Sequence, residues 1–533
     1  MHHSGGTGYG TGPQERVHQA PRTTAQPDKC PYETYQAQIP DCCAAAAAVQ
    51  DPYPRPPSGY DGRCYDECHR RTPYQEDTYP QTTCLTELPD VAPCNGTVRL
   101  PPPCEDSPSS GSSKDRREES PRRRCRVLAP ILLLVMGLLL GGLCLPFLLQ
   151  SAPVTHQQRL DVIRRILTEV PLIDGHNDLP WNVRKFVHNQ LGEVNLSSDL
   201  GRVDPWARSD WSHTDIPRLR AGLVGAQFWS AYVPCGAAQL NAVQLSLEQI
   251  DVIRRLAEMN AQHLTLVTSV KGLIEAHREG KIASLIGVEG GHSLGNSLGV
   301  LRTFYGLGAR YLTLTHACDT SWAVCSVGET NSTQDSTPGL SEFGKAVVRE
   351  LNRLGMLVDL SHVSTRTMRA ALQTTRAPVI FSHSAARALC NSTRNVPDDV
   401  LRNLAKNGGV AMVPFYTYFI TCNSTATIKD VIAHINHIRK VAGIDHVGIG
   451  AGFDGINFTP TGLEDVSRYP QLLATLLEDP TWTEEDIKKL AGLNLLRVFA
   501  KVEQVRDEWH RAAVLPVEKI SPPDNSACVY GAS

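Results

Sequence analysis

The chain has little net charge, because 52 Lys and Arg residues nearly balance 55 Asp and Glu residues and leave a formal charge of -3 over 533 residues. This balance gives no indication of nucleic-acid binding, for which an excess of basic residues would be expected. The charge excludes little else. Long uncharged apolar runs are also scarce, so the one such run is a natural boundary for dividing the chain.

Residues 1–126 have few large apolar side chains and show neither a helical nor a strand period. Pro, Tyr, Ser, Thr, Gly and Cys are abundant instead. Such a segment cannot bury enough apolar surface to offset the entropy lost on ordering, so we predict a disordered tail. Its cysteines, including Cys42, Cys43 and Cys125, are interpreted as free thiols, with palmitoylation or metal binding as alternatives.

Residues 127–149 form the long apolar run, about 23 residues without a charge, which is enough for a helix to cross a membrane. A cleaved signal peptide would start at the N-terminus and be shorter, so we predict an uncleaved anchor. Arginines are concentrated on the N-terminal side of the run. The positive-inside rule then predicts a single-pass type II protein of the cell membrane, with its C-terminal part extracellular.

Beyond the predicted anchor we expect a stalk at 150–160, a folded domain at 161–515 and a tail at 516–533. Glycosylation sequons in this part begin at Asn195, Asn331, Asn391 and Asn423. The sequon at Asn95 lies on the cytoplasmic side and should stay unmodified. Six cysteines beyond the anchor suggest two or three disulfides in an oxidising compartment, although spacing does not define their pairing.

Strand-like runs alternate with amphipathic stretches in the folded domain. The predicted strands are 172–178, 225–233, 284–289, 309–316, 356–362, 378–383, 409–415 and 446–450. The predicted helices between them include 245–259, 293–307, 342–354, 365–375, 396–405 and 428–442. Eight such repeats predict an α/β fold with a (β/α)8 TIM-type barrel, and a doubly wound open sheet is the alternative.

Metal-type side chains stand where several of these strands end. His176 and Asp178 lie at the end of the first strand and, being two residues apart in extended chain, face the same way. The others at strand ends are Glu289, His316, His362 and His383. Barrel closure would bring these distant positions together, which is why the barrel is favoured over the open sheet.

Histidines mixed with carboxylates suit Zn²⁺ better than Mg²⁺ or Ca²⁺, which prefer oxygen ligands. We predict that Glu289 bridges two ions, with His176 and Asp178 completing one site and His362 and His383 the other. Two such ions would hold a shared water, lower its pKa and polarise a scissile carbonyl. The ligand set therefore predicts a hydrolase.

Six motifs in this region carry a more specific likeness. They are Asp174-Gly175-His176-Asn177-Asp178-Leu179-Pro180, Gly287-Val288-Glu289-Gly290-Gly291-His292, Tyr311-Leu312-Thr313-Leu314-Thr315-His316, Val358-Asp359-Leu360-Ser361-His362-Val363-Ser364, Phe381-Ser382-His383-Ser384 and Arg394-Asn395-Val396-Pro397-Asp398-Asp399. Together they resemble the membrane dipeptidase (renal dipeptidase) family, and the resemblance runs from about Leu160 to Cys528.

The resemblance implies a zinc-dependent dipeptidase, with two Zn²⁺ per chain bridged by Glu289 in a metal-dependent hydrolase barrel. Its implied substrates are dipeptides, including the cysteinyl-glycine bond of the lipid mediator leukotriene D4, and some β-lactams. His316 would stabilise the tetrahedral oxyanion, and Arg394 would bind the substrate's free carboxylate. Taken alone, Arg394 would be interpreted as a solvated loop charge before a helix.

The family's cysteines imply that Cys235 pairs with Cys318 and Cys390 with Cys422, while Cys528 links two subunits into a homodimer. Cys325 is left over, either as a free thiol or as a sign of different pairing. Members of the family usually carry a GPI anchor, but no hydrophobic C-terminal signal is present here, so the helix at 127–149 is expected to provide the tether.

The sequence departs from the family pattern at Gly452. In the Gly-Asp-(Phe/Tyr)-Asp-Gly pattern after the eighth strand, an aspartate expected to bind the substrate's amino group and shuttle a proton is replaced by Gly452. Asp454, two residues on, belongs to the family pattern itself and is considered as a partial replacement that faces the same way. Losing a positioned acid/base group costs about 10² to 10⁴ in rate. Gly452 could therefore reflect a loss of function, a shift of substrate or a sequence error. The alternative to an active dipeptidase is a catalytically impaired homologue that binds metal and acts as a surface binding protein.

Overall fold

The computed structural model describes residues 133–140, 142, 155–331 and 338–519. Residues 133–140 and 142 are helical and belong to a unit separate from the one that contains residues 155–519. In these described ranges, no helix is both long and apolar enough to cross a membrane. The predicted tail at 1–126, much of the predicted anchor at 127–149 and Cys528 lie outside them.

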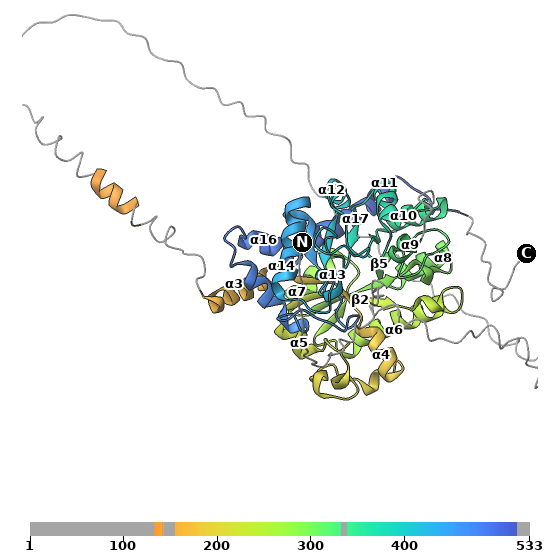
Figure 1. The fold of residues 1–533 in the computed structure, drawn as a ribbon, viewed down its shortest axis with the longest axis horizontal. Helices are drawn as coiled ribbons and strands as arrows, with labels where there is room; N and C mark the ends of the chain where they lie inside the picture. The colour runs from red at the N-terminus through yellow and green to blue at the C-terminus, as the bar shows by residue number, and fades with distance from the viewer. Residues whose placement is uncertain (1–132, 141, 143–154, 332–337, 520–533) are drawn as a thin grey trace, which may run out of the picture. The chain divides into compact units, whose positions relative to one another are not determined.

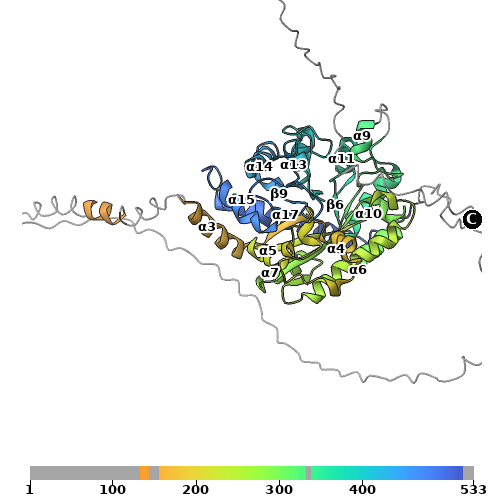
Figure 2. The same cartoon turned by 60° about the horizontal axis from the view of Figure 1, so that its bottom comes forward.

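Eight parallel strands close into a barrel (Figures 1 and 2). They are β1 (Leu172–Asn177), β2 (Val224–Tyr232), β4 (Ile282–Glu289), β5 (Ala309–Thr313), β6 (Leu357–Asp359), β7 (Ile380–Phe381), β8 (Val410–Val413) and β9 (Val447–Ile449). Pairing between β1 and β9 and between β2 and β4 completes the ring. The barrel prediction and all eight predicted strands are confirmed, and the open doubly wound sheet is excluded.

A ninth strand, β3 (Leu264–Leu266), was not predicted. It pairs with the beginning of β4, on the edge that β5 pairs with further along. Three residues, of which only Leu264 is buried, are too short a run to show a strand period.

Helices surround the barrel. Their bounds are α3 (His156–Glu169), α4 (Leu179–Val187), α5 (Ile216–Ala221), α6 (Ala242–Met259), α7 (Val270–Arg278), α8 (Leu298–Gly306), α9 (Ser326–Asn331), α10 (Glu342–Leu354), α11 (Thr365–Thr374), α12 (Asp398–Asn407), α13 (Thr417–Ile420), α14 (Ile428–Ala442), α15 (Tyr469–Leu476), α16 (Glu484–Lys488) and α17 (Asn494–Arg511). All six predicted helices are present, with α10 and α14 matching at both ends.

Local sequence explains why α10 was predictable. The Ser341 side chain accepts a hydrogen bond from the backbone N–H of Gly344, which caps the first turn. Gly355 ends the helix in the left-handed conformation, with φ of 75°. Val347 and Leu351, four residues apart, are buried on one face, so the apolar stripe packs the helix onto the barrel.

The amino-terminal end of the barrel is closed by α17. Leu495, Val498 and Phe499 of this helix share one buried apolar cluster with interior strand residues such as Ile173 and Tyr311. With that end filled, the carboxyl ends of the strands are left to form a site, which is where active sites of this fold lie.

Candidate metal centre

The residues predicted as ligands come together at the carboxyl ends of the strands. His176 lies near the end of β1, Glu289 is the last residue of β4, and His383 follows β7 by two residues. Glu289 is 2% exposed, and the histidines of the set are buried with it. The carboxyl ends of parallel strands in a closed barrel all lie at one rim, so residues far apart in sequence become neighbours.

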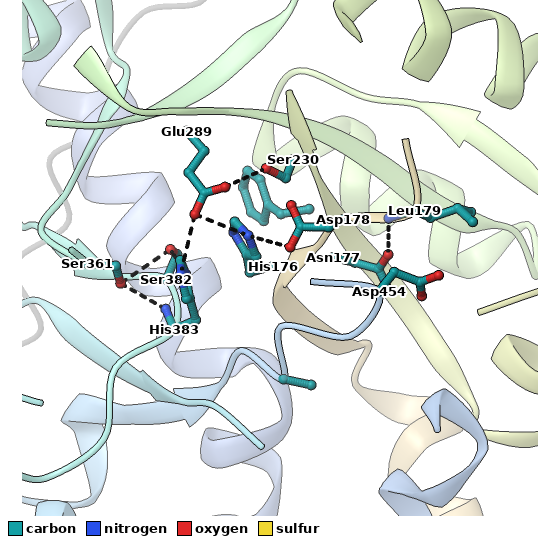
Figure 3. A network of polar contacts seen from close by, with 12 residues as sticks. His176, Asn177, Asp178, Leu179, Ser230, Glu289, Ser361, Ser382, His383 and Asp454 are labelled. Atoms are coloured by element: carbon teal, nitrogen blue, oxygen red, sulfur yellow. Dashed lines mark hydrogen bonds and ion pairs between the residues drawn. The ribbon is translucent and has the colours of Figure 1, made fainter. Parts of the chain in front are cut away.

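The carboxylate of Glu289 is the centre of the cluster. Its Oε1 lies 3.0 Å from Nε2 of His362, and 3.5 Å from Nε2 of both His176 and His383. Its other oxygen accepts a hydrogen bond from the hydroxyl of Ser230 at 3.2 Å. Figure 3 shows Glu289 pointing towards His176 and His383, with Ser230 beside its carboxylate.

Asp178 joins the cluster from the side of β1. Its Oδ2 lies 3.1 Å from Nε2 of His176. The backbone N–H of Asp178 donates to the carbonyl of Phe453, which ties this residue to the turn after β9. A Cβ on Gly455 would come within 2.0 Å of Asp178 Oδ2, so only glycine leaves room for the carboxylate at this position.

Hydroxyl groups orient the imidazole rings. Nδ1 of His176 lies 2.9 Å from the Tyr311 hydroxyl, and Nδ1 of His383 lies 2.8 Å from the Ser382 hydroxyl. These contacts leave Nε2 of each ring facing the cluster, as outer-sphere partners of metal ligands do. His362 adopts the strained left-handed conformation, with φ of 68°, and its carbonyl accepts the N–H of Ser326 at 2.7 Å.

Asp359 is a positioning residue that the sequence interpretation missed. Its Oδ1 accepts the backbone N–H groups of Ser361 and Ser382 at 3.1 and 2.8 Å. Its Oδ2 accepts the hydroxyls of Ser382 and Thr313, both at 2.6 Å. Asp359 thus links β5, β6 and β7 and holds the serine that orients His383. Its place as the last residue of β6, two residues before Ser361 and three before His362, was the available signal.

Two groups of potential ligands share Glu289. One contains His176, Glu289 and His383, the other Glu289, His316 and His362, and within each group the ligand atoms lie within 4.8 Å of one another. A buried carboxylate surrounded by imidazole nitrogens lacks solvent to stabilise its charge, and bound cations would supply that stabilisation. The donor set therefore fits a centre with two metal ions.

The pKa values of the cluster reflect the same electrostatics. Burial lowers the pKa of His362 and His383 well below the usual range, which favours the neutral imidazoles that metal binding requires. Burial alone would also lower the pKa of His176, but Asp178 and Glu289 outweigh it and raise the value to about 9. The two carboxylates thus make this part of the site attractive to positive charge.

His316 is completely buried behind the rim. Its ring centroid lies 4.4 Å from that of His362 and 4.9 Å from that of Tyr232. Burial lowers the pKa of His316 well below its usual value, so the ring is neutral. His316 lies with Glu289 and His362 in one group of potential ligands, so it is also placed to bind a metal ion, in keeping with its place among the metal-type side chains at the strand ends.

A cavity of about 260 Å³ opens onto the cluster and is lined by Arg394. Arg394 is 8% exposed, its guanidinium lies over the ring of Phe419 at 5.0 Å, and it donates long contacts of 3.4 Å to Ser384 and the His383 carbonyl. The interpretation of Arg394 as a solvated loop charge is therefore wrong. A buried guanidinium facing a small cavity suits a carboxylate ligand.

Gly452 lines the same cavity, with φ of 74° and only a contact at 3.9 Å to Ile456 for an added Cβ. Asp454 does not replace the missing aspartate. Its Oδ1 accepts from Asn182 Nδ2 at 3.1 Å and its Oδ2 accepts from the hydroxyl of Thr214. Figure 3 shows Asp454 beside Asn177 rather than with Glu289.

Two disulfides join Cys235 to Cys318 and Cys390 to Cys422, in the pairing that the family resemblance implied. Cys325 is buried and belongs to neither. Of the predicted glycosylation residues, Asn195, Asn391 and Asn423 are exposed, as modification requires. Asn331 lies at the end of α9.

The fold and the site together define a parallel barrel with a candidate two-ion centre at its carboxyl rim. Residues 160–513 match the family described as "Membrane dipeptidase (Peptidase family M19)". The chain belongs to this family of metallopeptidases.

Relatives include Dipeptidase 3 of Macaca fascicularis, 49% identical over 353 residues, which are 66% of this chain and 69% of that protein. Dipeptidase 3 of Mus musculus is 47% identical over 358 residues, covering 67% and 69% respectively.

Solved structures share the fold. A metallopeptidase of Rhodobacter sphaeroides, crystallised with a phosphinate mimic of the dipeptide L-Ala-D-Ala, has a TM-score of 0.55 and 24% identity and covers 62% of this chain and 99% of that one. The probable dipeptidase PvdM of Pseudomonas aeruginosa has a TM-score of 0.56 and 19% identity, covering 66% and 99%.

Proposed function

We propose that the chain is a zinc dipeptidase that holds two Zn²⁺ ions. The observation that carries this proposal is Glu289 Oε1, which lies within 3.5 Å of Nε2 of three histidines from different strand ends. His176 and Asp178 would hold one ion and His362 and His383 the other, with Glu289 between them. Histidine nitrogens mixed with carboxylates are typical zinc ligands.

Bound zinc would supply Lewis-acid polarisation of the amide carbonyl and activation of water. The chain's own residues do the rest. Arg394 binds the substrate's carboxylate and so places the amide over the ligand cluster. His316, kept neutral by burial, donates an N–H to the developing oxyanion.

Hydrolysis of alanyl-leucine by the purified full chain tests this proposal, with zinc content measured on the same sample. We expect about two zinc ions per chain and cleavage that stops on chelation and returns when zinc is added. No cleavage by a chain that holds two zinc ions would contradict the proposal.

A second candidate is favoured by Gly452: a zinc-bearing surface binding protein with little catalysis. No side chain at Gly452 reaches the cavity, and Asp454 is engaged with Thr214 and Asn182. If only the Gly452→Asp variant cleaves alanyl-leucine while the natural chain holds the same zinc, this second function is the correct one.

We also propose that the catalytic barrel is displayed at the cell surface as a disulfide-linked homodimer, tethered by the segment at 127–149. The proposal rests on the arginine flank, the sequons and Cys528 in the sequence. Protease digestion of intact cells should remove the barrel, and Cys528→Ser should convert the dimer to a monomer on a non-reducing gel. A barrel protected inside intact cells, or a dimer band retained by Cys528→Ser, would contradict it.

A further inference from the structure

The cavity over the ligand cluster carries an uneven distribution of charge. Among the described residues, the carboxylates that line it are Asp178 and Glu289, and both belong to the candidate ligand set. Their negative charge is neutralised by metal ions when the site is loaded. Arg394 contributes a positive charge that burial leaves poorly screened by water. A substrate therefore enters a site with an excess of positive charge.

Neutral residues form the end of the cavity next to β9. Ala451, Gly452, Gly455 and Ile456 line it there, and none has a polar side-chain atom. Asp454 belongs to the same turn, but it is absent from the lining and is held by Asn182 and Thr214. A positive group on a substrate would find at this end no carboxylate outside the candidate ligand set.

Strand order separates this end from the carboxylate contact. Arg394 follows β7, and β8 lies between β7 and β9, whereas the ligands His176 and Asp178 lie at the end of β1, which pairs with β9. A substrate with its carboxylate on Arg394 and its amide at the ligands extends its other end towards Gly452. For a dipeptide, that end carries an ammonium group, which would lose its hydration without gaining a partner.

We propose that this site prefers substrates with an uncharged acyl end, so that its best substrates are N-acyl amino acids rather than dipeptides with a free ammonium group. The inference rests on the proposed function, since it uses the same ligands and the same Arg394 contact. Pro414 and the ring of Tyr416, which follow β8, add uncharged lining for the acyl chain.

The reaction is an ordinary hydrolysis. Water adds its oxygen to the acyl carbon, the C–N bond breaks, and the nitrogen takes a proton from the same water. The products are a carboxylate and a free amino acid, and nothing is oxidised or reduced.

Propionyl-leucine and alanyl-leucine make a matched pair, because they differ only in the replacement of the ammonium group by hydrogen. For the full zinc-loaded chain we expect kcat/KM to favour propionyl-leucine by about tenfold, the effect of one unpaired buried charge. A natural chain that cleaves alanyl-leucine as well or better would overturn the inference.

Two variants separate charge from shape. Gly452→Asp and Gly452→Asn have nearly equal volume, and both residues tolerate the left-handed conformation that Gly452 adopts. We expect Gly452→Asp to reverse the preference towards alanyl-leucine and Gly452→Asn to keep it. If both variants reverse it equally, charge is not the cause and the inference fails.

Calorimetric titration of the same two ligands distinguishes this inference from the proposed function. If the zinc-loaded chain cleaves neither ligand, the proposed function fails. The two dissociation constants still show whether the site prefers the uncharged acyl end or the ammonium group. Tighter binding of propionyl-leucine would then support the inference. Equal or tighter binding of alanyl-leucine would overturn it.

Discussion

Two walls of the same cavity differ in the polarity of their side chains. The ligand wall, made of His176, Asp178, Glu289, His362 and His383, is polar, buried and cross-linked by hydrogen bonds. The β9 wall, made of Ala451, Gly452, Gly455 and Ile456, offers no polar side chain to the cavity.

The two walls also differ in what a substitution would disturb. Three of these five ligands contact a hydroxyl group: Tyr311 orients His176, Ser230 contacts Glu289, and Ser382 orients His383. A substitution there also disturbs the partners. At Gly452 an added Cβ meets only Ile456 at 3.9 Å, so a side chain there can alter recognition while the ligands stay in place.

Glu289→Gln should have the largest effect. It removes the carboxylate shared by both candidate ion positions, so we expect bound zinc to fall below one per chain and kcat/KM to fall by about 10³ or more. Metal analysis and dipeptide kinetics on one preparation measure both. Glu279→Gln, on the exposed surface, is the matched control and should change neither. Normal zinc content in Glu289→Gln would show that the ligand wall is not a metal centre.

His316→Asn tests whether the ligand wall extends behind the rim. If His316 donates to the oxyanion, its replacement should lower kcat by about 10² to 10³ while the zinc content stays unchanged. Zinc content and kcat are measured together. Loss of one zinc ion would instead identify His316 as a ligand in the group with Glu289 and His362.

Gly455→Ala and Gly452→Ala compare a crowded position, against a ligand, with an open one in the same turn after β9. The new methyl at 455 would come within 2.0 Å of Asp178 Oδ2, so we expect zinc affinity to fall about 10-fold to 100-fold. At 452 the methyl has room, and we expect unchanged zinc affinity with about 1–2 kcal/mol of backbone strain. Competition with a chelator measures the affinities. Equal losses in both variants would remove the distinction between the walls.

Asp454→Asn should have the smallest effect, on stability. Burial raises the pKa of Asp454 from 3.8 to about 7, so between these pH values the folded chain keeps a proton that the unfolded chain releases. The contribution is complete below about pH 4 and is lost as pH rises through 7, at about 1.4 kcal/mol per pH unit.

Urea unfolding of the wild-type chain and of Asp454→Asn, measured from pH 5 to 8, tests this. The variant should lose that part of the pH slope, whereas Asp251→Asn, at an exposed carboxyl, should keep it. An unchanged slope in Asp454→Asn would show that the Asp454 carboxyl is already ionised in the folded protein.

Several features were predictable because they depend on neighbours in the chain. The cap at Ser341 and the stop at Gly355 are local signals, and α10 was predicted with both ends correct. The short strand β3 was not predicted, because three residues are too few to show a strand period. The orientation of Asp454 was not predicted either, because it depends on Asn182 and Thr214, which are more than 200 residues away.

The sequence by itself determined the alternation of strands and helices, the ligand types at the strand ends and the absence of a carboxylate at Gly452, since these depend on residue identity and short-range order. Only the tertiary structure decided that Glu289 lies between three histidines, that Asp359 braces β5 to β7 and that Asp454 turns away from the cavity. These arrangements arise from barrel closure, which brings strand ends together at distances that chain spacing does not encode.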